Sequence, residues 1–410
     1  VDAARLGWRC AKHIADSLPS DEPGRLSMLI APLTMLCTTD WMARGVDDRH
    51  GHFDELRELC NAAGDTVSLA IGMTGLAAEL LYNRRAVAGS KLASEQMALL
   101  ESIGDPNLTI GLSFVAFTNW FNSGDFAEIL RWSQNAIDLA GGDPTAGAGF
   151  GMGAPLAVAT AFRSIARWWL GLPGWRADID DALIMSSISD QTTHGLAISW
   201  TYGVASCHGV FPVDDAMIQT IEAAARFAER AGNDTGFIGT QLTLGMALLR
   251  RDSDDDRLRG LAILTQILDT WLSGRAPSLV PVVELFAGRE RAIRGDRDTA
   301  LPVMRAALDG LFDEGRYGWC VCGTATFVEA LLHQVTGDEP AEAEKWIRRL
   351  ADIPAAGGAM LDITVLRLRT LLARARGDDD YHALLEGYRD TAKLFGLEGH
   401  IAWAGDLTSS

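Results

Sequence analysis

The stretch Gly141–Pro155, GGDPTAGAGFGMGAP, holds six glycines. Its Gly149, Gly151 and Ala154 fit the loose dinucleotide-binding pattern G-x-G-x-x-A. Such a loop cradles pyrophosphate only where it follows a strand and opens a helix. The residues before it, FAEILRWSQNAIDLA, are helical in pattern, and the phosphate-loop motif G-x-x-x-x-G-K-[ST] does not occur. We therefore expect residues 141–155 to form a flexible or ligand-adaptable joint and not a nucleotide site.

Two other stretches have residue types that can bind metal ions. His50 and His52 flank a glycine in an acidic turn, but no second pair of ligands follows at the spacing of a zinc site. The acidic run Asp252–Asp256 is similar to the start of a calcium loop. However, Arg257 and Ile263 stand where that loop needs glycine and glutamate. We expect solvated turns at both places and predict no metal-binding residue.

The cysteines and the catalytic motifs do not indicate an active site. Six cysteines are scattered among apolar neighbours without a C-x-x-C pair, and Cys320 and Cys322 fall on different sides of a helix. Reduced, buried thiols of a cytoplasmic protein are the expectation. Neither G-x-S-x-G nor H-E-x-x-H occurs, so we predict no catalytic residue and no cofactor-binding residue.

The composition restricts the class of partner. Apolar residues make up 48% and charged residues 22% of the 410 residues, which suffices for a large core. The net charge of −18 argues against nucleic acid and anionic lipid as partners, because both attract clustered lysine and arginine. No stretch reaches the roughly 18 apolar residues of a membrane span, and no signal peptide is recognisable. Because a helical pattern runs from Val1 onward, we expect a fragment of a longer protein.

Amphipathic helices are predicted along nearly the whole sequence. Apolar residues recur at intervals of three and four, as in segments 299–312 and 381–395, and strand patterns are almost absent. Helices are expected to stop at Gly-Asp and Asn-Asp steps, where glycine adopts the left-handed C-cap and aspartate opens the next helix. About nineteen helices of ordinary length result.

These stops recur with a period of about forty residues. Turns fall at Gly295, Gly337 and Gly377, and related turns fall near residues 83, 124, 211 and 252. A period of this length with two antiparallel helices per unit predicts an all-α superhelix of tetratricopeptide-like hairpins. Such a solenoid is stabilised by contacts between neighbouring hairpins.

One step of the array is longer than the others. From Gly124 to the next turn at Gly174 the chain runs 50 residues, and the surplus coincides with the glycine-rich stretch. We therefore expect one continuous solenoid with an N-terminal half at 1–140, an irregular joint at 141–155 and a C-terminal half at 156–410.

Aromatic and basic residues gather just after this joint. Trp and Arg dominate protein interfaces, so the cluster is a candidate surface for a partner or ligand. The alternative is that the tryptophans fill the gap between hairpins. The candidate residues are Arg163, Arg167, Trp168, Trp175 and Arg176.

Several segments resemble one known family beyond their helical pattern. They are similar to the C-terminal helical region of large actinobacterial multidomain adenylate/guanylate cyclase proteins, and the similarity covers essentially the whole chain. LGLPGWR and EGHIAW are its more specific parts. The segments are GWRCAKHIADSLP (7–19), FDELRELCNAAGD (53–65), LASEQMALLESIGDPNLTIGLSF (92–114), ARWWLGLPGWRADIDDAL (166–183), RGDRDTALPVMRAALDGLFDEG (294–315), LRLRTLLARARGDDDYHALLEGYR (366–389) and GLEGHIAW (396–403).

This resemblance implies a role in regulation. In the family, a class III cyclase domain and an ATPase precede the helical region, so ATP and Mg²⁺ are expected only in those domains. The implied partners are the parent's own cyclase and ATPase domains or another protein, and the chain itself is expected to be non-catalytic. Some relatives end in a LuxR-type helix-turn-helix. The alternative is therefore a small-molecule sensor domain of a LuxR-type transcriptional regulator, with its ligand in a concave groove near Trp175 and Arg176.

Overall fold

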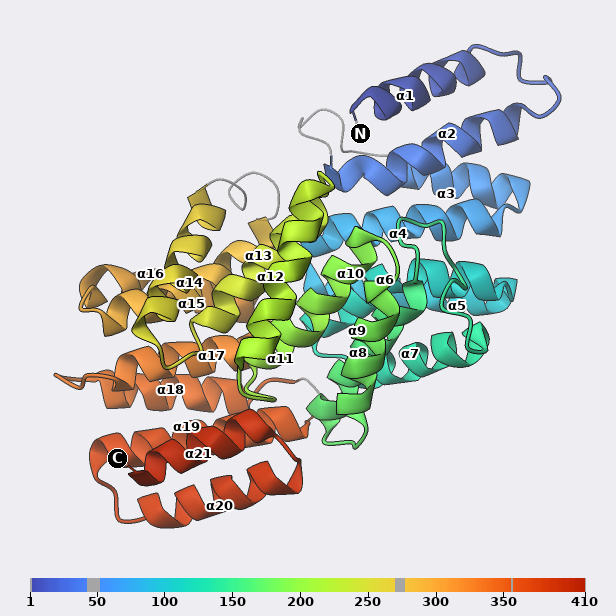
Figure 1. Cartoon of the computed structure of the whole chain (residues 1–410). Coiled ribbons are helices and arrows are strands. Elements are labelled where there is room, and N and C mark those ends of the chain that lie inside the picture. The colour runs from blue at the N-terminus through green and yellow to red at the C-terminus, as the bar shows by residue number, and fades with distance from the viewer. Residues whose placement is uncertain (1, 43–51, 270–276, 355–356, 410) are drawn as a thin grey trace.

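The computed structural model describes residues 2–42, 52–269, 277–354 and 357–409, and their long elements are all helices (Figure 1). Side chains open several helices as the sequence predicts: Asp65, Asp105 and Asp190 accept backbone N–H bonds at N-cap positions. None of the helices in these ranges has the length and apolar character needed to cross a membrane.

The elements follow one another as hairpins. In the first part they are α1 (Asp2–Asp16), α2 (Arg25–Thr39), the short η1 (Asp40–Met42), α3 (His52–Ala63), α4 (Thr66–Tyr82), α5 (Ala86–Ile103), α6 (Pro106–Ser123) and α7 (Phe126–Ala140). Then come α8 (Pro155–Leu170), α9 (Trp175–Ser187), α10 (Gln191–Ile198) continued through the π-helical turn η3 (Ser199–Gly203) into α11 (Val204–Cys207), α12 (Asp215–Arg230), α13 (Asp234–Leu248) and α14 (Asp254–Ile267). The last are η5 (Pro277–Leu279), α15 (Val280–Ile293), α16 (Arg297–Asp313), α17 (Tyr317–Leu332), α18 (Glu339–Ala351), α19 (Ala359–Arg376), α20 (Tyr381–Leu394) and α21 (Glu398–Ser409).

The forty-residue period is confirmed as an alternation of outer and inner helices. Outer helices such as α16 and α20 bury one face, whereas inner helices such as α8 and α17 are buried nearly all round. The predicted turns each follow an inner helix, and glycine adopts the left-handed conformation there at Gly124, Gly295 and Gly377. Most contacts join consecutive helices, as expected of an α-α hairpin array.

The inner helices also meet across the superhelix, which the sequence did not predict. α6 contacts α17, and α8 contacts α19, although about two hundred residues separate the members of each pair. At the α6–α17 crossing, Gly318 lies so close to the carbonyl oxygen of Phe121 that an added Cβ would overlap with it. Beside it, the buried Arg316 donates from Nε to Asn122 Oδ1 at 3.0 Å and from Nη1 to the carbonyl of Ser278 at 2.6 Å.

Aromatic side chains fill the space between these crossing helices. Phe121 contacts the rings of Trp169, Trp200 and Trp319, and Phe126 stacks on Trp169 with centroids 3.8 Å apart. Most buried apolar residues from α4 to α21 belong to this one core, and a smaller core joins α2 to α5. At these crossings the interior of the superhelix is therefore packed with its own side chains.

Candidate interaction surface

The two candidate tryptophans belong to the core. Trp168 lies on the inner helix α8 and is only 1% exposed, with its ring 5.3 Å from that of His208. Trp175 is buried as well and stacks on Phe211. Neither indole offers a surface: Trp168 lies on an inner helix that is buried nearly all round, and Trp175, the first residue of the outer helix α9, is covered by contacts such as that with Phe211. Of the two interpretations of these tryptophans, packing between hairpins is the one that their burial supports.

The three candidate arginines occupy two separate places. Arg163 and Arg167 both bind the buried carboxylate of Asp178, at 2.6 and 2.8 Å, and so fasten α8 to α9. Arg176 is exposed and pairs with Glu398 on α21 at 2.6 Å. All three guanidinium groups thus make ion pairs within the chain. The five residues do not form one surface.

The glycine-rich loop, residues 141–154, joins the helices α7 and α8, and no strand precedes it. Its backbone is held at two points: Gly147 N donates to Asn107 Oδ1 at 3.0 Å, and Gly153 N donates to Asp190 Oδ2 at 2.6 Å. At Gly147, where φ is +74°, a Cβ would also press on the backbone of Gly111. These contacts explain the glycines by close packing of the loop against α6 and α10.

The remaining motifs have structural partners where they are described. His50 lies outside the described residues. Among the described residues, no group of three or more His, Cys, Asp or Glu side chains is placed to bind a metal ion. In the acidic run, Asp254 pairs with Arg294 and Asp256 with Arg251. Cys320 and Cys322 are buried in α17.

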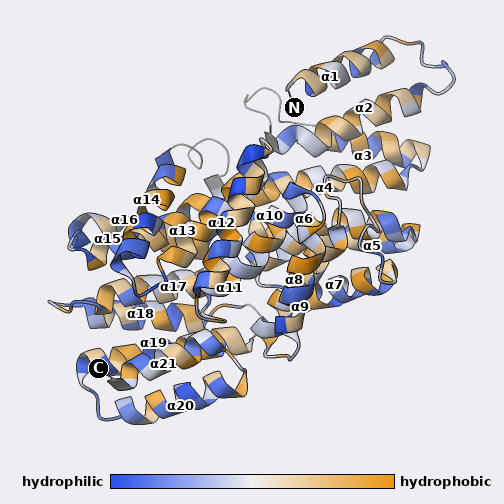
Figure 2. Cartoon of the chain, viewed as in Figure 1, coloured by the Kyte–Doolittle hydropathy of each residue, from blue (hydrophilic) through white to orange (hydrophobic). Residues whose placement is uncertain are grey.

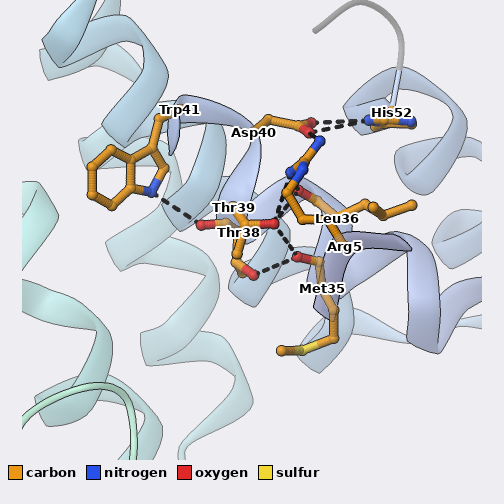
Figure 3. Close-up of polar contacts among 8 residues, drawn as sticks. All are labelled: Arg5, Met35, Leu36, Thr38, Thr39, Asp40, Trp41 and His52. Carbon is orange, nitrogen blue, oxygen red and sulfur yellow. Dashed lines mark hydrogen bonds and ion pairs between the residues drawn. The ribbon is translucent and has the colours of Figure 1, made fainter. Parts of the chain in front are cut away.

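Arg5 of the N-terminal helix α1 points toward Asp40 at the end of α2 (Figure 3). Arg5 is buried and donates from Nη1 to the carbonyl of Leu36 and to Thr39 Oγ1, at 3.2 and 2.8 Å. Its Nη2 donates to Asp40 Oδ1 at 2.9 Å, and His52 Nδ1 lies 3.1 Å from the other oxygen of the same carboxylate. Arg5 therefore anchors α1 to the end of α2 and the start of α3.

Lys12 continues this inward contact two turns along α1. Its Nζ lies 2.9 Å from Glu55 Oε1 on α3 and 3.0 Å from Asp16 Oδ2. Burial lowers the pKa of Lys12, but hydrogen bonds and attraction from the two carboxylates outweigh burial and leave that pKa above its usual value.

The opposite side of α1 is apolar and faces solvent. We call Ala3, Leu6, Cys10 and Ile14 the α1 apolar face, because their spacing of three and four residues places them on one side of the helix. Leu6 is 57% and Ile14 63% exposed. Helix α1 lies at the outer end of the array (Figure 2). The adjacent α2 adds exposed Met28 and Met35.

Helix α20, near the other end of the array, buries its apolar side and turns its polar side to solvent. On α20, Leu385 and Tyr388 are buried, while Glu386 and Asp390 face solvent. A terminal repeat of a solenoid normally presents such a polar outer side. Sequence reasoning did not find the α1 apolar face. The signal was present in the stripe Arg5, Arg9 and Lys12, but the acidic partners Asp40 and Glu55, which turn this stripe inward, lie outside α1.

Thiol labelling should detect this exposure directly. Cys10 is the exposed member of the six cysteines, and the other five are buried. Burial also raises the pKa of the Cys60 thiol to about 11 and that of the Cys207 thiol to about 12, which suppresses their reactive thiolate forms. We expect a chromogenic disulfide reagent to react quickly with one thiol per native chain and with six after unfolding in guanidinium. Cys10→Ser should remove the fast reaction, and a native chain without a fast thiol, or a fast thiol that survives in Cys10→Ser, would contradict the exposure of Cys10 and the burial of the other five.

Comparison with known proteins leaves the family open. No known protein-family model matches the chain, and no curated protein matches it either. What the structure establishes is an all-helical protein of about twenty helices, packed as sequential hairpins with an apolar face on the N-terminal one.

Proposed function

We propose that this chain is a non-catalytic regulatory module that binds a partner protein through the α1 apolar face. The supporting observation is the orientation of α1, which buries Arg5 and leaves Leu6 and Ile14 in water. Exposed apolar patches on soluble proteins mark contact surfaces, since covering a leucine or isoleucine contributes about 1.5–3 kcal/mol.

The internal contacts of α1 favour a rigid docking surface. The ion pairs of Arg5 with Asp40 and of Lys12 with Glu55 fix the helix before any partner arrives. A surface that is already ordered loses less conformational entropy on binding. The occupant that we propose is an apolar helix face of the ATPase segment that precedes the helical region in the resembling cyclase proteins. Through this contact the chain would then regulate that enzyme.

The sensor alternative has less support at the place where the sequence suggested it. Trp175 is buried against Phe211, and Arg176 is paired with Glu398. Two pockets of the described surface lie away from Trp175 and Arg176. One of about 290 Å³ lies between α5 and α7, and one of about 480 Å³ lies beside Phe312 and Arg349.

Charge substitutions on α1 test the proposal. The double variant Leu6→Glu and Ile14→Glu should bind the separately produced ATPase–cyclase segment at least about tenfold more weakly, since two carboxylates would have to be buried or repelled. Its melting temperature should stay near that of the unchanged chain, because both positions face solvent. Isothermal titration calorimetry measures the affinity.

The matched control places the same charges on exposed apolar residues outside this face. Ile184→Glu with Leu394→Glu changes two side chains of similar size on α9 and α20, and affinity should not change. Protection of Cys10 from maleimide in the complex gives a second readout. Equal affinities for the two double variants, or no binding by the unchanged chain, would refute the docking role of α1.

A further inference from the structure

Four charged residues converge on the inner side of the C-terminal helices. Glu329 on α17 accepts from Arg367 Nη1 on α19 at 2.7 Å. Its other oxygen lies 2.6 Å from Arg289 Nε on α15 and 3.4 Å from Arg250 Nη1 at the end of α13. We call Arg250, Arg289, Glu329 and Arg367 the arginine cluster. Its members are about forty residues apart, so each successive inner helix contributes one.

The arginine cluster carries an excess of two positive charges in a chain whose net charge is −18. The side chains of Arg250 and Arg367 are only 7% and 9% exposed, and Glu329 is equally buried. Buried charges are costly unless each is paired. The Nε–H groups of Arg250 and Arg367 are buried and have no hydrogen-bond partner in the structure. One carboxylate therefore leaves donors and charge uncompensated.

Three titratable groups beside the arginine cluster do not supply the missing charge. Tyr388 hydrogen-bonds to His400, and burial raises its pKa above the usual value for tyrosine. Arg250 Nη2 donates to the carbonyl oxygen of Cys207 at 3.3 Å, and burial raises the pKa of the Cys207 thiol to about 12. Cys322 is a buried thiol whose pKa is raised by burial too. All of these groups are neutral near pH 7.

Aromatic rings fix the positions of the buried arginines. The guanidinium of Arg367 lies 4.3 Å and that of Arg250 5.2 Å from the ring centroid of Trp403. Arg250 also lies 5.3 Å from the ring of Phe286. Cation–π contacts of this kind hold planar guanidinium groups in place. Arg289 is 22% exposed and connects the arginine cluster to solvent.

We infer that the arginine cluster binds a small, doubly charged oxyanion, either a phosphoryl or a dicarboxylate group, which reaches it beside Arg289. Two negative charges would balance the excess, and arginine donors match the geometry of both groups. This site lies far along the chain from α1 and is independent of the proposed docking function.

A thermal-shift experiment on the whole chain tests the inference. In Tris-chloride buffer, inorganic phosphate or succinate is added at ionic strength matched with sodium chloride. At least one of the two anions should raise the melting temperature beyond the effect of chloride, because a ligand of the folded state stabilises it. The anion that raises the melting temperature shows whether the arginine cluster binds a phosphoryl or a dicarboxylate group. If both anions act like chloride, the inference is wrong.

Two variants separate a specific site from a general salt effect. Arg289→Ala should weaken binding by about tenfold or more in calorimetric titration, since it removes a charged donor. Arg348→Ala is the control, because Arg348 is exposed and paired only with Glu344 on its own helix. Glu329→Gln should melt at a lower temperature than the unchanged chain in chloride. The active anion should raise the melting temperature of this variant by more than it raises that of the unchanged chain. Equal affinity of Arg289→Ala and the unchanged chain would also overturn the inference.

Discussion

Replacing Gly318 by alanine is expected to lower the free energy of unfolding by about 3 kcal/mol or more. The new Cβ would overlap with the carbonyl oxygen of Phe121, which is backbone and cannot rotate away, and would also press on the Phe121 ring. Gly318 lies in a helix without a left-handed φ, so alanine costs no backbone strain and gains up to about 1 kcal/mol of helix propensity. Net destabilisation would therefore measure the close approach of α6 and α17.

The control is Gly387→Ala on the outer helix α20, where an added Cβ meets no atom within 4 Å. This variant should be equally stable or more stable by up to about 1 kcal/mol. Differential scanning calorimetry compares the two variants. We expect Gly318→Ala to separate the melting of the N- and C-terminal halves, because the α6–α17 contact joins them. A variant that melts in one transition at the unchanged temperature would show that the crossing contributes little.

The period of the fold could be predicted because local chemistry sets it. Glycines such as Gly124, Gly295 and Gly377 end helices, and the distance between such turns gives the size of a hairpin. The closure of the superhelix could not be predicted in this way. It depends on contacts such as Gly318 with Phe121, between residues far apart in the sequence, and no repeat pattern specifies which turns of a solenoid meet.

The burial of the candidate tryptophans could not be predicted for a related reason. Residue type favoured Trp168 as an interface residue, but an inner helix buries large aromatic side chains as readily as an interface does. Conversely, Leu6 and Ile14 have the spacing of a buried stripe. The position of Asp40 at the end of α2 fixes the rotation of α1 by pairing with Arg5, so the apolar stripe faces outward.

The arginine cluster was visible in the sequence only as spacing. Arg250, Arg289, Glu329 and Arg367 follow the same forty-residue interval as the turns. Equivalent positions of neighbouring repeats lie side by side in a solenoid. Charged residues that recur at the repeat interval on inner helices therefore indicate a cluster once the hairpin register is known. Hydropathy alone places these residues on a solvated side, whereas three of them are buried.

Acidification from pH 6.5 to 4.5 is expected to destabilise the protein by about 5 kcal/mol, owing to His208 and His400. Both rings are buried: His400 Nε2 donates to the carbonyl of His208 at 3.0 Å, and His400 Nδ1 accepts from Tyr388 at 2.9 Å. Burial lowers the pKa of His208 to about 4 and that of His400, which also faces Arg367, to about 3.

The sign of this effect follows from proton uptake. Between pH 6.5 and the lowered values the unfolded chain binds protons at these histidines and the folded chain does not. Stability is therefore complete above about pH 6.5 and is lost as the pH falls, by about 2.5 kcal/mol per histidine at pH 4.5. The carboxylate of Glu329, whose pKa its arginine partners hold well below the usual range despite burial, adds its own loss only at lower pH.

Guanidinium denaturation at several pH values measures the slope of the free energy of unfolding against pH. His400→Gln keeps a donor for the His208 carbonyl and an acceptor for Tyr388 but cannot be protonated, so its loss of stability between pH 6.5 and 4.5 should fall by about half. His13→Gln on α1 is the control, because His13 is exposed and should leave the slope unchanged. A wild-type pH dependence retained in His400→Gln would mean that the His400 ring can take up a proton inside the folded core, contrary to its burial between Tyr388 and the carbonyl of His208.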